Sequence, residues 1–128
     1  MPPAEAPSSD SLEALRLRLA EFASSRDWDQ FHSPKNLSMA LIAEAAELVE
    51  HFQWLSEEQS KNLDANKLQA VSHELADILI FLIRTAHMLD VDLIAAAYEK
   101  VEINEHRYPV DRVRGSARRA EEYEEDDK

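Results

Sequence analysis

The chain has 128 residues and a formal net charge of −12, from 26 acidic and 14 basic residues. This length suits one domain with its own hydrophobic core, and the acidic balance argues against nucleic-acid binding through a basic face. The absence of cysteine excludes disulfides and thiol chemistry and allows a cytoplasmic address.

Two features of the composition set the fold class. The longest apolar run, near residues 78–83, is far too short to span a bilayer, so no membrane partner is expected. The single glycine, Gly115, lies beyond the last helical pattern, and few runs are rich in β-branched residues. We therefore predict an all-α protein.

The chain begins with residues 1–10, which have neither the charge nor the apolar run of a signal peptide and are predicted to form a disordered leader. A first helix is predicted from Ser11 to about Arg26, with an apolar stripe at helical spacing. The link at residues 27–32, DWDQFH, is rich in aromatic residues. Its side chains either close the end of a helix bundle or stack on a ligand.

A second helix is predicted from Ser33 and Pro34 to about Leu55, because a serine cap followed by proline is a strong start signal. Its wide apolar arc is typical of a helix that is buried on more than one side. The acidic strip on its other side therefore faces an enclosed space, where carboxylates need partners or a cation. The strip consists of Glu44, Glu47, His51 and Trp54.

A third helix is predicted from about Asn66 to Leu89, after a stretch in which Ser56 and Gln59 have the spacing of a capping box. It carries its own polar strip, because offsets of three, four and seven residues return side chains to one side of a helix. This strip consists of Glu74, Asp77, Phe81 and Arg84.

A fourth helix is predicted from Asp90 or Asp92 to about Arg107, where Tyr108 and Pro109 end it. Three hydrogen-bond donors share an arc on this helix: Lys100, Asn104 and Arg107. Residues 110–128 form a basic block followed by an acidic block with little to bury. They are predicted to be a disordered tail or a contact with a partner chain.

The two acidic strips predict a metal site. Two acids three residues apart are neighbours on a helix, and two such pairs on facing antiparallel helices can converge on one point. Oxygen ligands without histidine or cysteine suit Mg²⁺ or Mn²⁺ better than Zn²⁺. Such an ion binds substrate phosphates, with the donors of the fourth helix on the outer oxygens, so the pattern predicts a phosphoanhydride hydrolase. A lone Glu-x-x-Glu is usually a solvated face; its pairing with a second strip beside apolar helices gives it weight.

The same residues resemble a known family. Glu44-Ala-Ala-Glu47, followed after 26 residues by Glu74-Leu-Ala-Asp77, resembles the ExxE…ExxD signature of the all-α nucleoside triphosphate pyrophosphohydrolases, the MazG-like superfamily. Four blocks are similar to its dCTP pyrophosphatase branch: RDWDQFHSPKNL, EAAELVEHFQW, ELADILIFL and KVEINEHRYP. The similarity covers about residues 15–109 of a domain expected at 11–109.

The resemblance implies a four-helix-core subunit that assembles as a dimer or a dimer of dimers, that is, a homotetramer. It implies Mg²⁺-dependent cleavage of a nucleoside triphosphate to the monophosphate and pyrophosphate, in the sanitation of nucleotide pools. By position it implies that the four acids, Glu44, Glu47, Glu74 and Asp77, hold the metal. The motif does not settle which carboxylate is the base, and we predict Glu47. It further implies a nucleotide pocket lined by Trp28, His32 and Trp54, with Phe81 at a position that faces the nucleotide. It implies contacts to the phosphates or the sugar from Lys100, Asn104 and Arg107.

Two positions depart from the branch: Phe81 stands where tyrosine is expected, and Leu19 where relatives can carry histidine. Both changes remove hydrogen bonding while stacking survives. Since polar contacts to a base discriminate more sharply than apolar fit, the departures favour a wider set of pyrimidine or modified deoxynucleotides beside dCTP.

Three other readings compete. A di-iron or di-manganese bundle would use Glu-x-x-His elements, which the acidic strips lack. A phosphoribosyl-ATP pyrophosphatase would also bind a metal through acidic residues, but the aromatic link at residues 27–32 fits that enzyme poorly. A non-catalytic helical dimerisation module remains as the alternative, although it leaves the two acidic strips unexplained.

Overall fold

The computed structural model of the chain describes residues 11–125, and every regular element in that range is helical. The expected leader at residues 1–10 lies outside the described range. The described residues form two compact units, which divide between Val91 and Asp92. The helices are α1 (Leu12–Ser25), the 3₁₀ turn η1 (Asp29–Phe31), α2 (Pro34–Phe52), α3 (Glu57–Ser60), α4 (Ala65–Met88), α5 (Leu93–Arg107), α6 (Val110–Val113) and α7 (Ala120–Glu125).

Side-chain caps fix where the helices begin. The Ser33 hydroxyl accepts a hydrogen bond from the Asn36 amide at 3.2 Å, and Pro34 occupies the first helical position, as predicted. Ser56 and Gln59 form the predicted capping box, which starts α3. The second helix ends at Phe52, three residues before its predicted end at Leu55.

Two aspartates in the left-handed backbone region end α1 and α4. Asp27 has φ of 54° and Asp90 has φ of 55°, a conformation that aspartate adopts more readily than most residues. In each case the next amide closes the helix end, with Trp28 donating to the Ala23 carbonyl and Val91 to the Ala86 carbonyl, both at 2.9 Å. The first of these turns sends the chain directly into the aromatic link between α1 and α2.

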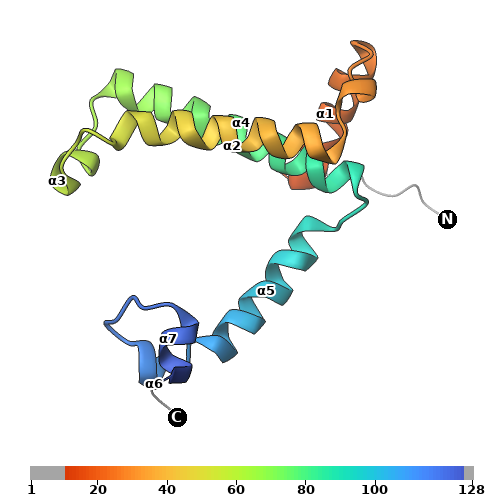
Figure 1. Cartoon of the computed structure of the whole chain (residues 1–128). Helices are drawn as coiled ribbons and strands as arrows, with labels where there is room; N and C mark the ends of the chain where they lie inside the picture. The colour runs from red at the N-terminus through yellow and green to blue at the C-terminus, as the bar shows by residue number, and fades with distance from the viewer. Residues whose placement is uncertain (1–10, 126–128) are drawn as a thin grey trace. The chain divides into compact units, whose positions relative to one another are not determined.

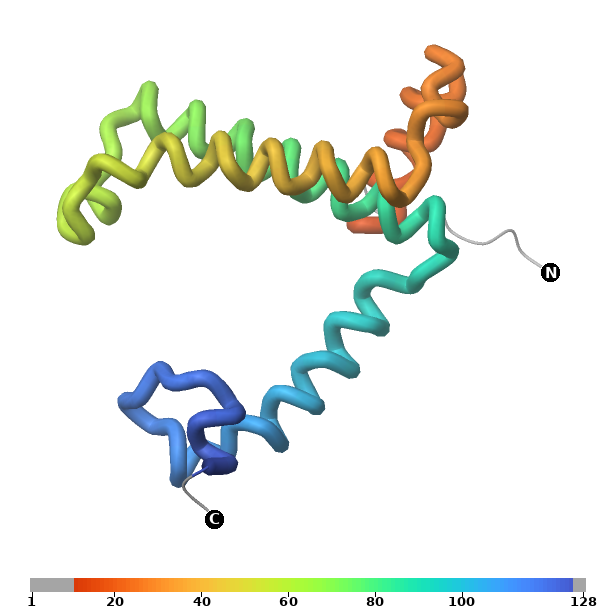
Figure 2. Tube along the Cα trace, viewed as in Figure 1, coloured from red at the N-terminus to blue at the C-terminus, as the bar shows by residue number. Residues whose placement is uncertain are grey.

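The first unit is built on α2 and α4, which lie side by side along most of their length, with α1 against α4 (Figures 1 and 2). Leu37 of α2 is only 2% exposed, and Val71 and Ile83 of α4 and Ala23 of α1 are also buried. These residues form the core that holds the helix pair in register, so the polar residues of α2 and α4 keep fixed neighbours.

Large apolar side chains remain exposed on both long helices of this unit. Ile42 is 67% exposed, although its helix is the one whose apolar arc was predicted to be buried on more than one side. The exposed residues recur every three, four or seven positions: Met39, Ile42 and Val49 on α2, and Leu68, Leu75, Leu79 and Leu82 on α4. Contiguous apolar surface of this kind is typical of an interface.

The second unit contains α5, α6 and α7. Tyr123 of α7 is 3% exposed, its ring contacts Tyr108 edge-on at 6.3 Å, and its hydroxyl donates to the Ser116 side chain at 3.1 Å. The Tyr108 hydroxyl accepts from the Ala120 amide at 3.2 Å. The sequence predicted a disordered tail or a contact with a partner chain for residues 110–128, but in the structure Tyr123 packs on Tyr108, a contact that the charge pattern obscured.

None of the helices in the described part of the chain has the length and apolar character of a membrane span.

Replacing Leu37 with alanine is expected to destabilise the first unit by about 2–5 kcal/mol, because it leaves a cavity between tightly packed helices. Thermal and urea unfolding followed by circular dichroism measure the change. Lys35→Ala, at an exposed position of the same helix, is the matched control. A loss for Leu37→Ala no larger than the loss for Lys35→Ala would contradict the proposed core.

Candidate metal and nucleotide site

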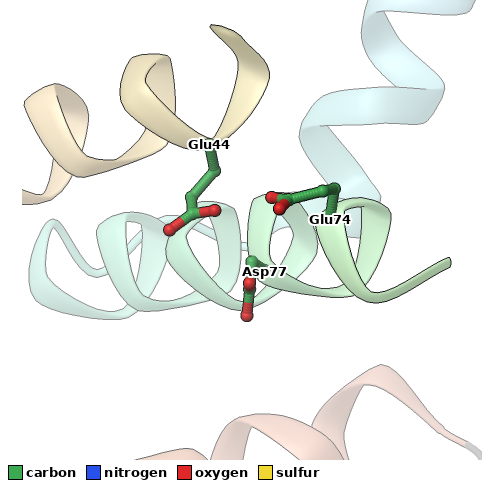
Figure 3. A group of neighbouring side chains, drawn as sticks. All are labelled: Glu44, Glu74 and Asp77. Carbon is green, nitrogen blue, oxygen red and sulfur yellow. The ribbon is translucent and has the colours of Figure 1, made fainter. Parts of the chain in front are cut away.

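Three of the four predicted acids meet between α2 and α4. Glu44 extends from α2 towards α4, which carries Glu74 and Asp77 (Figure 3). One carboxylate oxygen from each of the three lies within 4.8 Å of the other two. Glu47, one turn after Glu44, is outside this group of three, but its charge acts on the Glu44 carboxyl.

One oxygen of the Glu44 carboxyl and one of the Glu74 carboxyl lack partners among the described residues. In each carboxyl this oxygen is the buried Oε2 atom, although buried polar atoms are almost always paired. The pKa of Glu44 is raised to about 7, because its protonated form can donate a hydrogen bond to Glu74, because it is partly buried, and because Glu47 and Asp77 repel its negative charge. Near neutral pH, the group requires either a shared proton or a cation.

The donor set decides which kind of cation fits. The group offers carboxylate oxygens alone, with no histidine or cysteine in it. Such ligands suit hard divalent ions such as Mg²⁺ or Mn²⁺. These residues fit an ion because two of their buried oxygens have no partner. Acids exposed to water would not need an ion.

A cavity of about 300 Å³ adjoins the acids and is lined mainly by apolar and aromatic side chains, a size at the lower end for small-molecule sites. Asp77 belongs both to the acidic group and to the cavity wall. The Trp28 ring lies 6.3 Å from the His32 ring and 5.6 Å from the Phe22 ring, centroid to centroid. The lining residues are Leu19, Phe22, Ala23, Trp28, His32, Asp77, Ile80, Phe81 and Arg84.

The aromatic link between α1 and α2 thus contributes to a cavity wall, with Trp28 and His32 on it. Phe81 and Leu19, the two positions that depart from the expected pattern, line the same cavity. The cavity wall therefore has apolar side chains at both positions where a polar one was expected.

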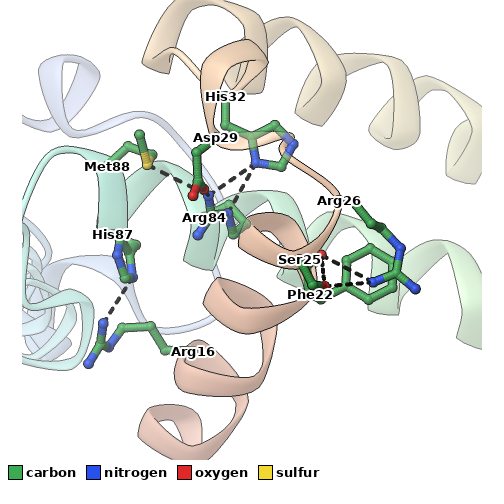
Figure 4. Close-up of polar contacts among 9 residues, drawn as sticks. All are labelled: Arg16, Phe22, Ser25, Arg26, Asp29, His32, Arg84, His87 and Met88. Carbon is green, nitrogen blue, oxygen red and sulfur yellow. Dashed lines mark hydrogen bonds and ion pairs between the residues drawn. The ribbon is translucent and has the colours of Figure 1, made fainter.

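Arg84 lines the cavity, although the sequence pattern assigned it no role in the site. Its side chain is almost fully buried, with Nη2 2.9 Å from Asp29 Oδ1 and Nε donating to His32 Nδ1 at 3.2 Å (Figure 4). Met88 Sδ accepts a weak hydrogen bond from Arg84 Nη2 at 3.7 Å. The three-residue spacing between Phe81 and Arg84 indicated that the two side chains share one strip of the helix, so Arg84 could have been placed near the site. Asp29 carried no such signal, since its partner lies 55 residues away.

The other predicted site residues belong to other parts of the chain. Trp54 follows α2, is 86% exposed and does not line the cavity. Lys100, Asn104 and Arg107 lie on α5, in the second unit, where Arg107 pairs with Glu121 at 2.9 Å.

The chain is similar in sequence to proteins of known activity. The chain is 45% identical over 112 residues to dCTP pyrophosphatase 1 of Bos taurus, a match that covers 86% of this chain and 66% of that protein. It is 41% identical over 111 residues to dCTP pyrophosphatase 1 of Homo sapiens, covering 85% and 65%. The chain therefore spans just under two thirds of these relatives' length.

A solved structure agrees. A pyrophosphatase from Archaeoglobus fulgidus superimposes with a TM-score of 0.74 and 34% sequence identity, over 83% of this chain and 99% of that one. The model of the MazG-like family matches residues 40–123, which include all four acids and the whole of α5. The all-α prediction is confirmed, and this chain belongs to the MazG-like family.

Proposed function

We propose that this protein is a Mg²⁺-dependent nucleoside triphosphate pyrophosphohydrolase, with Mn²⁺ as a possible substitute. It hydrolyses dCTP or a modified pyrimidine deoxynucleoside triphosphate to the monophosphate and pyrophosphate, as part of nucleotide-pool sanitation in the cytoplasm. One observation carries the proposal: a group of carboxylates with unpartnered buried oxygens shares Asp77 with a cavity of about 300 Å³. The names of the relatives, dCTP pyrophosphatase 1, support the same activity.

The acids would hold the ion. Glu44, Glu74 and Asp77 supply converging oxygens, and Glu47, adjacent to Glu44, completes the set of four. A bound divalent ion neutralises phosphate charge and makes the phosphorus easier to attack. Glu47 is the most exposed member of the set along α2 and is assigned as the base that takes a proton from the attacking water.

The cavity would hold the nucleoside. Trp28, His32 and Phe81 line it and offer ring faces to a base. Trp54 is assigned to the nucleotide from the resemblance to the dCTP pyrophosphatase branch. Lys100, Asn104 and Arg107 are assigned to the phosphates or sugar, for which Arg107 would exchange its ion pair with Glu121.

The first test of the proposal is a substrate panel. Purified protein with Mg²⁺ is incubated with canonical and modified NTPs and dNTPs, and the products are resolved by ion-exchange chromatography. Monophosphate with pyrophosphate is expected, with pyrimidine deoxynucleotides turned over fastest. Diphosphate with orthophosphate would contradict the cleavage site, and no turnover of any substrate would favour the non-catalytic dimerisation module.

Glu47→Gln is expected to lower kcat by about a hundred-fold or more, the usual contribution of a general base, because an amide cannot accept the proton. The same chromatographic assay measures it. Glu50→Gln, at an exposed position of the same helix, is the matched control and should leave kcat nearly unchanged. Near wild-type turnover by Glu47→Gln would remove Glu47 from the catalytic set.

The pKa of Glu44 gives a pH prediction for the metal-free protein. The folded state keeps the Glu44 proton up to a pKa of about 7, whereas the unfolded chain releases it near the ordinary value of 4.5. Between these values the folded state binds more protons, so its stability falls as the pH rises. Mg²⁺ is expected to raise the melting temperature more at pH 8 than at pH 6, where it must displace a proton.

Differential scanning fluorimetry with and without Mg²⁺ at the two pH values measures this effect. Glu44→Gln is expected to flatten the pH dependence and to remove most of the Mg²⁺ shift, while Glu50→Gln keeps both. An equal Mg²⁺ shift at pH 6 and pH 8 in the wild type would show that Glu44 does not hold a proton that competes with the ion.

We further propose that the protein is a homo-oligomer, a dimer or a tetramer, through the exposed apolar stripes of α2 and α4. Sedimentation equilibrium is expected to give a mass of two or four chains. Leu75→Glu, which puts a charge on the α4 stripe, should shift the protein towards monomer, while Gln69→Glu, at an exposed polar position of the same helix, should not. A wild-type monomer at all concentrations would contradict the proposal.

A further inference from the structure

The hydrogen-bond donors of Arg84 are unequally used. Its side chain is only 4% exposed, yet Nη1 has no hydrogen-bond partner among the described residues, whereas Nε and Nη2 contact His32 and Asp29. A guanidinium carries five N–H donors in a rigid plane. One edge of this plane is therefore held by the protein, and the nitrogen left over belongs to a residue that lines the cavity.

The surroundings of Arg84 suit a neutral base better than a phosphate. Asp29 forms an ion pair with the guanidinium and cancels its charge locally. The other walls near it are apolar or aromatic, including Phe22, Ile80 and Phe81. A charge-neutralised donor among rings can pair with a polar base edge, while the excess positive charge that a triphosphate would need is absent from these cavity residues.

His32 supplies a second donor. Arg84 can only donate, so His32 Nδ1 must accept, which leaves the proton of the neutral ring on Nε2. The pKa of His32 is lowered by burial and by the Arg84 charge, against a smaller opposing effect of Asp29, so the ring stays neutral at neutral pH. Arg84 and His32, which both line the cavity, thus each keep an N–H donor that their mutual hydrogen bond does not use, and that bond fixes their orientation.

We propose that Arg84, positioned by Asp29 and His32, is a specificity-determining residue that recognises a base edge carrying two adjacent acceptors. Cytosine presents such an edge, with N3 and O2 both acceptors. Uracil and thymine carry N3–H there, which would face another donor. This corner restores the polar discrimination that Phe81 and Leu19 cannot provide, and it rests on the proposed function in that a nucleotide occupies the cavity.

Binding of deoxynucleoside monophosphates without metal tests this inference independently of turnover. Calorimetry on the full-length chain is expected to give a Kd for dCMP about ten- to a hundred-fold lower than for dUMP, the range of one well-paired base contact. Arg84→Met should bring the two Kd values within about three-fold of each other. Met88→Leu, which alters only a weak contact with Arg84 Nη2, is the control and should keep the wild-type ratio.

A purely structural role for Arg84 gives a different result. If the residue only ties the α1–α2 link to α4, Arg84→Met raises both Kd values equally and the ratio is unchanged, which would overturn the inference. Arg84→Lys keeps a positive charge for Asp29 but lacks the planar fork of the guanidinium. If the methionine variant folds poorly, the lysine variant separates the structural role from base recognition, and it should also narrow the ratio of the Kd values for dUMP and dCMP.

A change in the ligand provides a measurement that needs no variant. Replacing N3 of cytosine by a C–H group, in 3-deaza-dCMP, should weaken binding to the wild-type protein by about ten-fold. Equal Kd values for dCMP and 3-deaza-dCMP would overturn the inference. Base discrimination by Arg84 without any triphosphate turnover would leave this inference standing and remove the proposed activity, and turnover without Arg84-dependent discrimination would do the reverse.

Discussion

The site depends on one unfavourable arrangement: the carboxyls of Glu44 and Glu74 are held together with buried oxygens that no described group satisfies. Left alone, two such groups repel each other or retain a proton, and the raised pKa of Glu44 shows that this one resists ionisation. The packing of α2 on α4 around Leu37 and Val71 prevents the carboxyls from separating. The hydrophobic core therefore maintains a concentration of negative charge that a divalent cation can relieve.

The helix pattern of the sequence predicted the larger part of this arrangement. The serine caps and the spacing of Glu44, Glu74 and Asp77 are local properties of helices, and a three- or four-residue offset determines a shared face whatever lies around it. The four long helices accordingly begin and end within about three residues of the predicted positions. The aromatic link was left open between two roles, and the structure places Trp28 and His32 on the cavity wall.

Interactions between distant residues could not be predicted in the same way. The Asp29–Arg84 pair joins residues 55 positions apart, and nothing in either local sequence indicates the other. The exposed position of Trp54 likewise follows from α2 ending at Phe52, which places the tryptophan beyond the last helical turn. The packing of Tyr108 on Tyr123 was hidden within a segment whose charge pattern is typical of disorder. For the Asp29–Arg84 and Tyr108–Tyr123 contacts, the partner lies beyond the few residues over which helical periodicity predicts neighbours.

A single helix connects the two halves of the site. Glu74, Asp77, Phe81 and Arg84 follow one another along α4 at offsets of three and four residues, so the acids occupy one stretch of the strip and the cavity residues the next. At 1.5 Å per residue, the ten residues from Glu74 to Arg84 span about 15 Å. That length is comparable to a nucleotide extended from its phosphates to its base. Because the helix is rigid, the separation between the acidic group and the guanidinium is fixed before any ligand arrives, and Asp77 lies where the two parts meet.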